Sequence, residues 1–294
     1  MGGLDPAVRI AGELLRGYSA EVTTPDRQSL DAAATMMPAK APVYIASLPK
    51  DTSGGQLAVA RQLRDLGLRP VPHIVARNID TRDTLEQLVK DFAQQAGVNR
   101  ALILGGDRDV PAGEYNCALQ LIQSGVLEAN GITKIAIGCY PEGHPAIADD
   151  ILRRALFDKL EAADKAGFDV RLISQLCFSA KSIAAYVKSL RDTGVTAKIR
   201  IGLAGPASTR ILLKYAAICG VGPSLKLLKN RQSIAKGLMQ SNTPEQLLLD
   251  IAEHIARDPS LAITGVHFFT FASLKNTIAW ANEWQAANAS APAA

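Results

Sequence analysis

Two acidic residues stand where a carboxylate could do acid–base or ligand-binding chemistry. Glu21 lies inside the apolar run Tyr18–Val22, where a carboxylate is costly to bury unless it is paired or used. Burial favours the protonated form that a general acid needs, although an edge position in water fits the run equally well. Asp107 ends the run Ala101–Asp107, whose two glycines would let backbone approach a flat ligand while the carboxylate accepts from ring N–H donors. A Gly-Asp turn is also ordinary loop chemistry.

A segment rich in proline and glycine is the most specific piece of the sequence. Positions 138–145 read Gly-Cys-Tyr-Pro-Glu-Gly-His-Pro, and the prolines and glycines restrict the backbone to a short, rigid excursion. The segment presents Tyr140 and His144 together, either to a ligand or as part of a plain connector. His73 lies in the apolar run Pro70–Ile74. This position fits a core histidine that bonds a backbone carbonyl at least as well as it fits a histidine that contacts a ligand.

No group of side chains has the spacing of a metal site. Glu142, His144 and His73 match no ligand pattern, and the four cysteines contain no Cys-x-x-Cys pair. The sequence also lacks Gly-x-Ser-x-Gly, a P-loop and Gly-x-Gly-x-x-Gly, which disfavours hydrolases and nucleotide-loop enzymes. Well-separated cysteines in apolar surroundings indicate reduced core residues, so we expect a cytoplasmic protein without a metal.

Eight β-rich runs, each followed by a segment of helical period, must position these residues. The expected strands are Tyr18–Val22, Val43–Ser47, Arg69–Val75, Ala101–Gly106, Lys134–Tyr140, Val170–Leu176, Lys198–Ala204 and Val266–Phe271. This alternation favours a parallel sheet with right-handed crossovers, and eight such units close into an α/β fold of the (β/α)8 TIM-barrel type. A doubly wound open sheet is the alternative, but its first strand usually leads into a glycine-rich turn, and Val22–Asp26 contains no glycine. In a barrel the chemistry sits at the carboxyl ends of the strands, where the polar residues are Glu21, Ser47, His73, Asp107, Tyr140, Glu142, His144, Gln175 and Thr270.

The helical segments complete a single catalytic domain over residues 1–294. The expected helices are Gly55–Leu66, Arg82–Gln95, Tyr115–Leu127, Ile151–Lys165, Ala180–Asp192 and Ser208–Ile218, with N-caps at Asp80 or Thr81, Ser179 and Ser208. We expect an N-terminal segment at 1–15 and a disordered tail at 287–294. A helical insertion at 220–264, before the last strand, reads as two helices, Leu225–Met239 and Thr243–Arg257.

The composition fits one large core and a small-molecule partner. Of 294 residues, 48% are hydrophobic and 20% are charged. The net charge of +4 is spread along the chain, which argues against a nucleic-acid surface and mildly favours an anionic small ligand. No run approaches the roughly 18 apolar residues of a membrane span. The amphipathic outer helices could support a homo-oligomer.

Four motifs, in this order, resemble the methylenetetrahydrofolate reductase family, and the match runs from about Tyr18 to Trp284. They are Gly106-Asp107, the Tyr-Pro-Glu-x-His-Pro loop at 140–145, Ile-Ser-Gln at 173–175 and Gly-x-His-Phe-x-Thr at 265–270. The resemblance implies a hydride relay, in which NADH or NADPH reduces FAD and the flavin passes hydride to 5,10-methylenetetrahydrofolate, forming 5-methyltetrahydrofolate.

The resemblance also implies roles for individual residues. Glu21 looks like the general acid that assists formation of the reactive iminium form of the folate. Asp107 looks like the carboxylate that holds the pterin ring and tunes the flavin, with Gln175 as a second substrate contact. The implied cofactor-binding residues are Ser47, His73, Gly106, Asp107, Tyr140 and His144. The chain looks like the short bacterial form without a regulatory extension.

Several positions depart from the family pattern. Gly105 stands where the family usually has an arginine, and Ala163 where it has a basic residue, although Lys159 and Lys165 are near. Both changes remove cations expected to meet flavin phosphates or ribityl oxygens. The other departures are Val22-Thr23-Thr24-Pro25 for Phe-Phe-Pro-Pro, Arg210 for an aromatic residue and Ala272-Ser273 for Asn-Arg.

These departures keep two alternatives open. One is a flavin-independent enzyme in which the nicotinamide transfers hydride directly to the folate, and the other is a non-catalytic folate-binding barrel. An unrelated barrel lyase or methyltransferase would need a Schiff-base lysine or a zinc thiolate cluster at a strand end. The sequence has neither there.

Overall fold

The computed structural model describes residues 5–24, 29–47, 53–221 and 241–288. Eight parallel strands close into a barrel in the order β1-β10-β7-β6-β5-β4-β3-β2. Their bounds are β1 (Ser19–Val22), β2 (Pro42–Ile45), β3 (Arg69–Val75), β4 (Arg100–Leu104), β5 (Lys134–Cys139), β6 (Asp169–Ser174), β7 (Lys198–Ala204) and β10 (Ile263–Phe269). Each strand overlaps one of the eight predicted runs, so the (β/α)8 barrel is confirmed and the doubly wound sheet is not found.

Buried strands of this kind form because both of their faces are covered. In β7, every residue after Lys198 is buried, and the run is rich in isoleucine and leucine, as is typical of parallel sheets. β10 pairs with β7 in parallel, with a shift of register between Ile263 and Gly265. Parallel pairing brings the carboxyl ends of successive strands to the same end of the sheet.

The helices that follow the strands have the predicted caps. Their bounds are α1 (Pro6–Leu15), α2 (Leu30–Met36), α3 (Ser53–Asp65), α4 (Arg82–Ala96), α5 (Ala118–Gln123), α6 (Val126–Ala129), α7 (Asp149–Lys165), α8 (Ala180–Asp192), α9 (Thr209–Ile218), α11 (Glu245–Arg257) and α12 (Leu274–Asn288). The side chains of Thr81, Ser179 and Ser208 each accept a hydrogen bond from a backbone N–H in the first turn of α4, α8 and α9. The N-caps are confirmed because a short hydroxyl side chain satisfies an otherwise free amide at a helix start.

The structure differs from the sequence prediction at several element boundaries. The helix predicted over Tyr115–Leu127 is wrong as one unit: α5 and α6 are separated at Gly125, whose φ of 75° is left-handed and ends the helix. The helix predicted over Leu225–Met239 lies outside the described residues, whereas the second helix of the insertion is present as α11. A short antiparallel pair, β8 (Ala207–Ser208) with β9 (Ser241–Asn242), was not predicted. α12 continues to Asn288 and covers the first two residues of the predicted tail.

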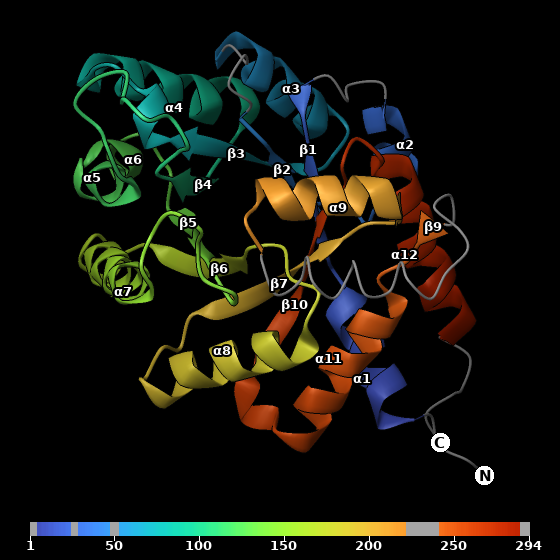
Figure 1. Ribbon diagram of the computed structural model, residues 1–294. Coiled ribbons are helices and arrows are strands. Elements are labelled where there is room, and N and C mark those ends of the chain that lie inside the picture. The colour runs from blue at the N-terminus through green and yellow to red at the C-terminus, as the bar shows by residue number, and fades with distance from the viewer. Residues whose placement is uncertain (1–4, 25–28, 48–52, 222–240, 289–294) are drawn as a thin grey trace. The chain divides into compact units, whose positions relative to one another are not determined.

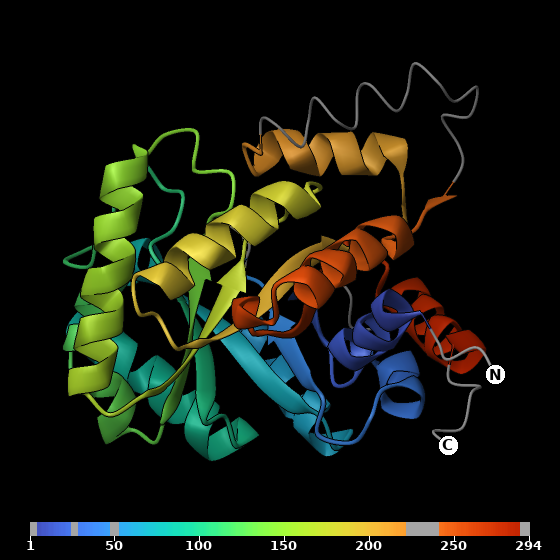
Figure 2. The ribbon, with the colours of Figure 1, turned by 90° about the horizontal axis from the view of Figure 1, so that it is seen from below.

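The contacts divide the chain into two compact units. The first comprises Met1–Ala20, Tyr140–Asp149 and Ile173–Ala294, and the second comprises Glu21–Cys139 and Asp150–Leu172. In the first unit, α11 packs against α1 and α8, as Figure 2 shows. In the second unit, β2, β3, β4 and β5 pair edge to edge, and α3 lies beside α4 (Figure 1). A single catalytic domain stays a prediction.

Across the described ranges, no helix is both long enough and apolar enough to cross a membrane.

Candidate functional site

The Glu21 carboxylate and the His73 imidazole lie together in the second unit. Glu21 is on β1 and His73 is on β3. Oε2 of Glu21 is 3.5 Å from Nε2 of His73, and the two side chains are 19% and 9% exposed. This is an ion-pair distance when the imidazole carries a proton. The family resemblance implies separate roles for the two residues, Glu21 as an acid and His73 at the flavin, and the structure places them in contact.

Gln56 and Tyr44 surround His73, and neither was predicted as a site residue. The buried Gln56 amide, in α3, donates to the carbonyl of Ile45 at 3.3 Å and to that of His73 at 3.5 Å. It therefore ties the end of β2 to β3. The buried ring of Tyr44 meets the His73 ring edge to face, with 6.4 Å between their centroids. A polar side chain in the first turn of a helix carries no local signal that it is buried, which is why the sequence did not single out Gln56.

A cationic group interacts with Tyr44. Burial lowers the pKa of the Arg171 guanidinium below its ordinary value, and repulsion from Arg100 adds to the effect. The Tyr44 hydroxyl and the Asp169 carboxylate act in the opposite direction. Arg100 in turn bonds Asp169, with Nη2 and Oδ2 3.0 Å apart. The surroundings of Tyr44 are therefore charged rather than purely apolar.

Asp107 follows β4, as predicted. Gly106, which was predicted as the last residue of the strand, lies two residues after β4 ends at Leu104. The Asp107 side chain is exposed, so its carboxylate is open to a ligand that arrives from solvent. Gly106 has a φ of 100°, and a Cβ built there would lie 2.5 Å from Cγ1 of Val75. Close packing against β3 therefore requires a glycine at this position, independently of any cofactor contact.

Arg77 holds the loop that carries Asp107. Its Nε donates to the carbonyl of Asn116 at 2.9 Å, and its Nη1 donates to the carbonyl of Arg108 at 2.8 Å. The backbone N–H of Arg77 also donates to the carbonyl of Gly105 at 2.9 Å. Together these bonds hold the loop after β4 against Arg77, which belongs to η2 (Ala76–Asn78).

In the first unit, the predicted loop at 140–145 brings two rings together. The rings of Tyr140 and His144 meet edge to face, with 5.7 Å between centroids and 89° between planes. The backbone N–H of Gly143 donates to the carbonyl of Tyr140 at 3.2 Å, and the Tyr140 N–H donates to the hydroxyl of Tyr186 at 3.4 Å. Both rings are half-buried, so each keeps a face or an edge for a ligand.

A thiol ties this loop to the segment after β6. Sγ of the buried Cys177 donates to Oε1 of Glu142 at 3.4 Å. Gln175, the predicted substrate contact, is half-buried, and its Oε1 accepts from the backbone N–H of Leu176 at 2.8 Å. The Gln175 side-chain oxygen is thus used locally, and its NH2 group is the donor that a ligand carbonyl would meet.

Of the two lysines near Ala163 on α7, only Lys159 is largely buried. Ala163 itself is fully buried on α7. Nζ of Lys165 bonds Oε1 of Glu161 at 2.6 Å on the exposed face. Burial lowers the pKa of the Lys159 amine, and the thiols of Cys139 and Cys117 partly offset this. Lys159 therefore lies near the end of β5 and the start of α5.

Ser47, a further predicted cofactor-binding residue, lies two residues after the end of β2 and is half-buried. Among the described residues, no cluster of three or more histidine, cysteine, aspartate or glutamate side chains is arranged to hold a metal ion.

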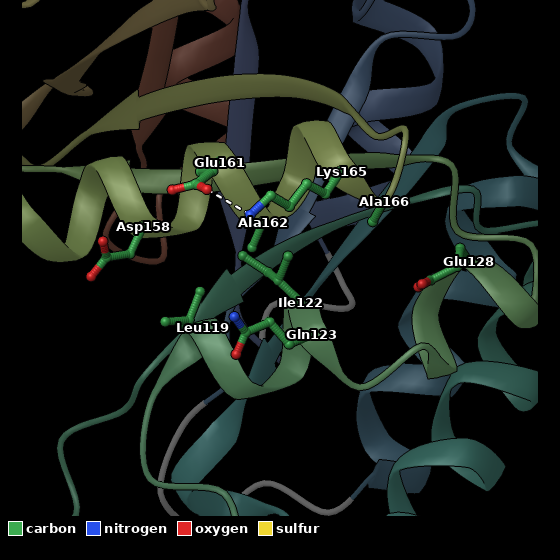
Figure 3. Close-up of a pocket in the computed structure, with 9 residues that line it drawn as sticks. All are labelled: Leu119, Ile122, Gln123, Glu128, Asp158, Glu161, Ala162, Lys165 and Ala166. Carbon is green, nitrogen blue, oxygen red and sulfur yellow. Dashed lines mark hydrogen bonds and ion pairs between the residues drawn. The ribbon is translucent and has the colours of Figure 1, made fainter.

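One groove of the second unit lies away from these residues. It has a volume of about 450 Å³ and lies between α7 and the α5–α6 segment (Figure 3). Its lining includes Glu128, Asp158 and the Glu161–Lys165 pair. None of the predicted site residues lines it, so it is not the candidate site.

Solved structures resemble the chain at low sequence identity. An uncharacterized protein from Clostridium thermocellum, whose structure binds two copies of 5-methyl-5,6,7,8-tetrahydrofolic acid, has a TM-score of 0.61 and 14% identity, covering 92% of this chain and 95% of that chain. Phosphonopyruvate hydrolase in complex with oxalate and Mg++ has a TM-score of 0.48 and 10% identity, covering 95% of this chain and 85% of that chain. Triosephosphate isomerase from Bartonella henselae has a TM-score of 0.48 and 9% identity, covering 90% and 98%. The first likeness supports the barrel fold, and the two weaker ones carry no argument.

The family comparison covers nearly the whole barrel. The model of the methylenetetrahydrofolate reductase family matches residues 18–280. That span contains all eight barrel strands, from β1 to β10, and every predicted site residue. The chain therefore belongs to the methylenetetrahydrofolate reductase family.

Proposed function

We propose that the protein is an oxidoreductase that interconverts 5,10-methylenetetrahydrofolate and 5-methyltetrahydrofolate by hydride transfer. Family membership supports a folate-related oxidoreductase in kind. The observation that carries the finer proposal is the largely buried carboxylate of Glu21, held 3.5 Å from the His73 imidazole. A carboxyl group with a proton-bearing neighbour is what the opening of a methylene-bridged folate needs.

The proton goes to N10, the folate nitrogen that separates from the bridging carbon. As the bond between N10 and the bridging carbon breaks, Glu21 protonates N10, and the bridging carbon becomes an iminium on N5. Hydride addition to that carbon then produces the methyl group. Reversal of these steps, with Glu21 as the base, describes oxidation of the methyl form.

The pterin ring would be held by residues of complementary hydrogen-bonding type. The exposed Asp107 carboxylate can accept from pterin N–H groups, and the Gln175 NH2 can donate to a ring oxygen. Binding of 5-methyl-5,6,7,8-tetrahydrofolic acid by the clostridial protein of similar fold supports a folate as the ligand.

The hydride would come from FAD, which NADH or NADPH would reduce. The flavin-binding residues would be Ser47, His73, Gly106, Asp107, Tyr140 and His144. The Tyr140–His144 pair has aromatic and N–H edges of the kind a flavin ring needs. The largely buried Lys159 is a cation of the kind that a flavin's phosphates or ribityl oxygens need. When bound, the flavin would supply the hydride, and the residues named above would bind and orient it.

Direct transfer from the nicotinamide to the folate is the second candidate. Gly105 and the buried Ala163 stand where two cations are expected in the family, so the site offers fewer partners to flavin phosphates. In that case the same Glu21 would act on the same substrate without a bound flavin.

The test combines a spectrum with a folate assay. Flavin absorbance of the purified protein, or saturable FAD titration, supports the flavin route, while nicotinamide-linked turnover without flavin supports direct transfer. Glu21→Gln should abolish oxidation of 5-methyltetrahydrofolate by an artificial acceptor or by the nicotinamide. Glu13→Gln, which alters an exposed carboxylate paired with Arg9, is the matched control. Tight folate binding with no turnover under any of these conditions would make the protein a folate-binding barrel and refute the proposal.

A further inference from the structure

We infer that Glu21 and His73 share one proton, and that His73 stores it in the resting protein. Glu21 then acts as the conduit through which that proton reaches the substrate. The contact between Oε2 and Nε2 at 3.5 Å, with both side chains largely buried, is the observation behind this inference. The pairing is a property of the structure alone, whereas its use in turnover rests on the proposed function.

The ordinary acidities of the two groups decide where the proton resides. Glutamate and histidine differ by about 2 pKa units in water, so a single proton prefers the imidazole about a hundredfold. Burial of a lone carboxyl group would favour its neutral form, as the sequence analysis expected for Glu21. A protonated imidazole in direct contact opposes that effect, because each charge stabilises the other.

The surroundings of His73 are consistent with a charged pair. From β2, the Tyr44 ring contacts the imidazole edge to face. The Arg171 guanidinium interacts with Tyr44, and also with Arg100 and Asp169, which pair with each other. Leu102, the register partner of His73 on β4, is apolar. From α3, the Gln56 amide bonds the backbone carbonyls of Ile45 and His73. A cation such as Arg171 would oppose a charge on His73 and favour the anionic form of Glu21. The contacts of Arg171 are with Tyr44, Arg100 and Asp169, whereas Glu21 touches the imidazole directly.

The proton transfer moves the one shared proton in two steps. His73 gives its Nε2 proton to Oε2 of Glu21, so the Nε2–H bond breaks, an Oε2–H bond forms and the imidazole becomes neutral. Glu21 then gives that proton to the folate nitrogen, so the Oε2–H bond breaks and an N–H bond forms on the substrate. After turnover, one proton from solvent returns to His73. In this scheme His73 is a positioning residue, because it acts on the substrate only through Glu21.

Imidazole NMR on the full-length protein tests the pairing itself. The chain has four histidines, so a ¹⁵N spectrum is simple, and comparison with His73→Gln identifies the His73 signal. We expect His73 to be doubly protonated at pH 7 and to lose at least one pKa unit in Glu21→Gln. Glu253→Gln, an exposed carboxylate on α11 that pairs with Arg257, should leave the signal unchanged. A His73 that is neutral at pH 6, or whose titration is the same in Glu21→Gln, would overturn the inference.

The pH profile of turnover tests the use of the stored proton. In the reductive direction, kcat/KM should fall on the alkaline side with the His73 pKa measured by NMR. His73→Gln should move the alkaline fall of kcat/KM to lower pH, toward the pKa of Glu21 without its partner. A variant with a merely structural defect would instead lower the rate equally at every pH. An unmoved alkaline fall in a folded His73→Gln variant would refute the relay. If the protein has no folate turnover, the proposed function fails, and the NMR result still decides whether the pair exists.

Discussion

Replacing Gly106 with alanine tests whether packing, and not only a ligand, requires the glycine before Asp107. The glycine has a φ of 100°, and a new Cβ would lie 2.5 Å from Cγ1 of Val75. A left-handed backbone costs alanine about 1–2 kcal/mol, and overpacking adds about 1–3 kcal/mol. The Gly106→Ala variant should therefore lose about 2–5 kcal/mol of unfolding free energy.

Gly67→Ala is the matched control for the backbone cost. Gly67 has a φ of 75°, and a Cβ there meets nothing within 4 Å, so only about 1–2 kcal/mol should be lost. Urea unfolding followed by tryptophan fluorescence measures both variants. In a Val75→Ala background, Gly106→Ala should cost less unfolding free energy than it does in the unchanged protein, because the clash with Cγ1 of Val75 is removed. Equal losses in Gly106→Ala and Gly67→Ala, with no coupling to Val75, would refute the packing argument.

Two further predictions concern the buried lysine and the buried thiol. Because burial lowers the pKa of Lys159 in the folded chain, the folded state holds fewer protons than the unfolded state at alkaline pH below about 10.4. Lys159→Met should therefore stabilise the protein at neutral pH, and this gain in stability should shrink as the alkaline pH rises toward about 10.4. If the urea midpoints of the two proteins differ by the same amount at every pH, this prediction is wrong. Cys177→Ala removes the hydrogen bond to Glu142, and should lower the unfolding free energy by about 1–2 kcal/mol and weaken folate or flavin binding through the 140–145 loop. A Glu142→Gln variant, which can still accept from the thiol, should lose less in a thermal melt, and an equal loss would argue against that hydrogen bond.

Local patterns in the chain were sufficient for the barrel. Each run of β-branched and apolar residues became a strand, because alternating strand and helix periods leave a parallel closed sheet as the natural way to bury both faces. The caps at Thr81, Ser179 and Ser208 were predictable because a cap needs only neighbours in the chain. The break between α5 and α6 was missed because the amphipathic pattern continues across Gly125.

The candidate site residues were likewise named from the chain alone, because the motifs of the family are short and contiguous, and their roles stay predictions. The contacts between these residues could not be predicted in this way. Whether Glu21 faces solvent or another side chain depends on which residue of β3 stands near it, and the tertiary structure brings His73 to that place. In the same way, only packing separates the solvent-exposed Lys165 from the largely buried Lys159, and only the approach of Val75 explains Gly106. The sequence by itself determined which residues stand at the ends of the strands, because strand and helix periods are local. The tertiary structure decided which of them touch, because contacts between strands depend on register and on burial that no local pattern encodes.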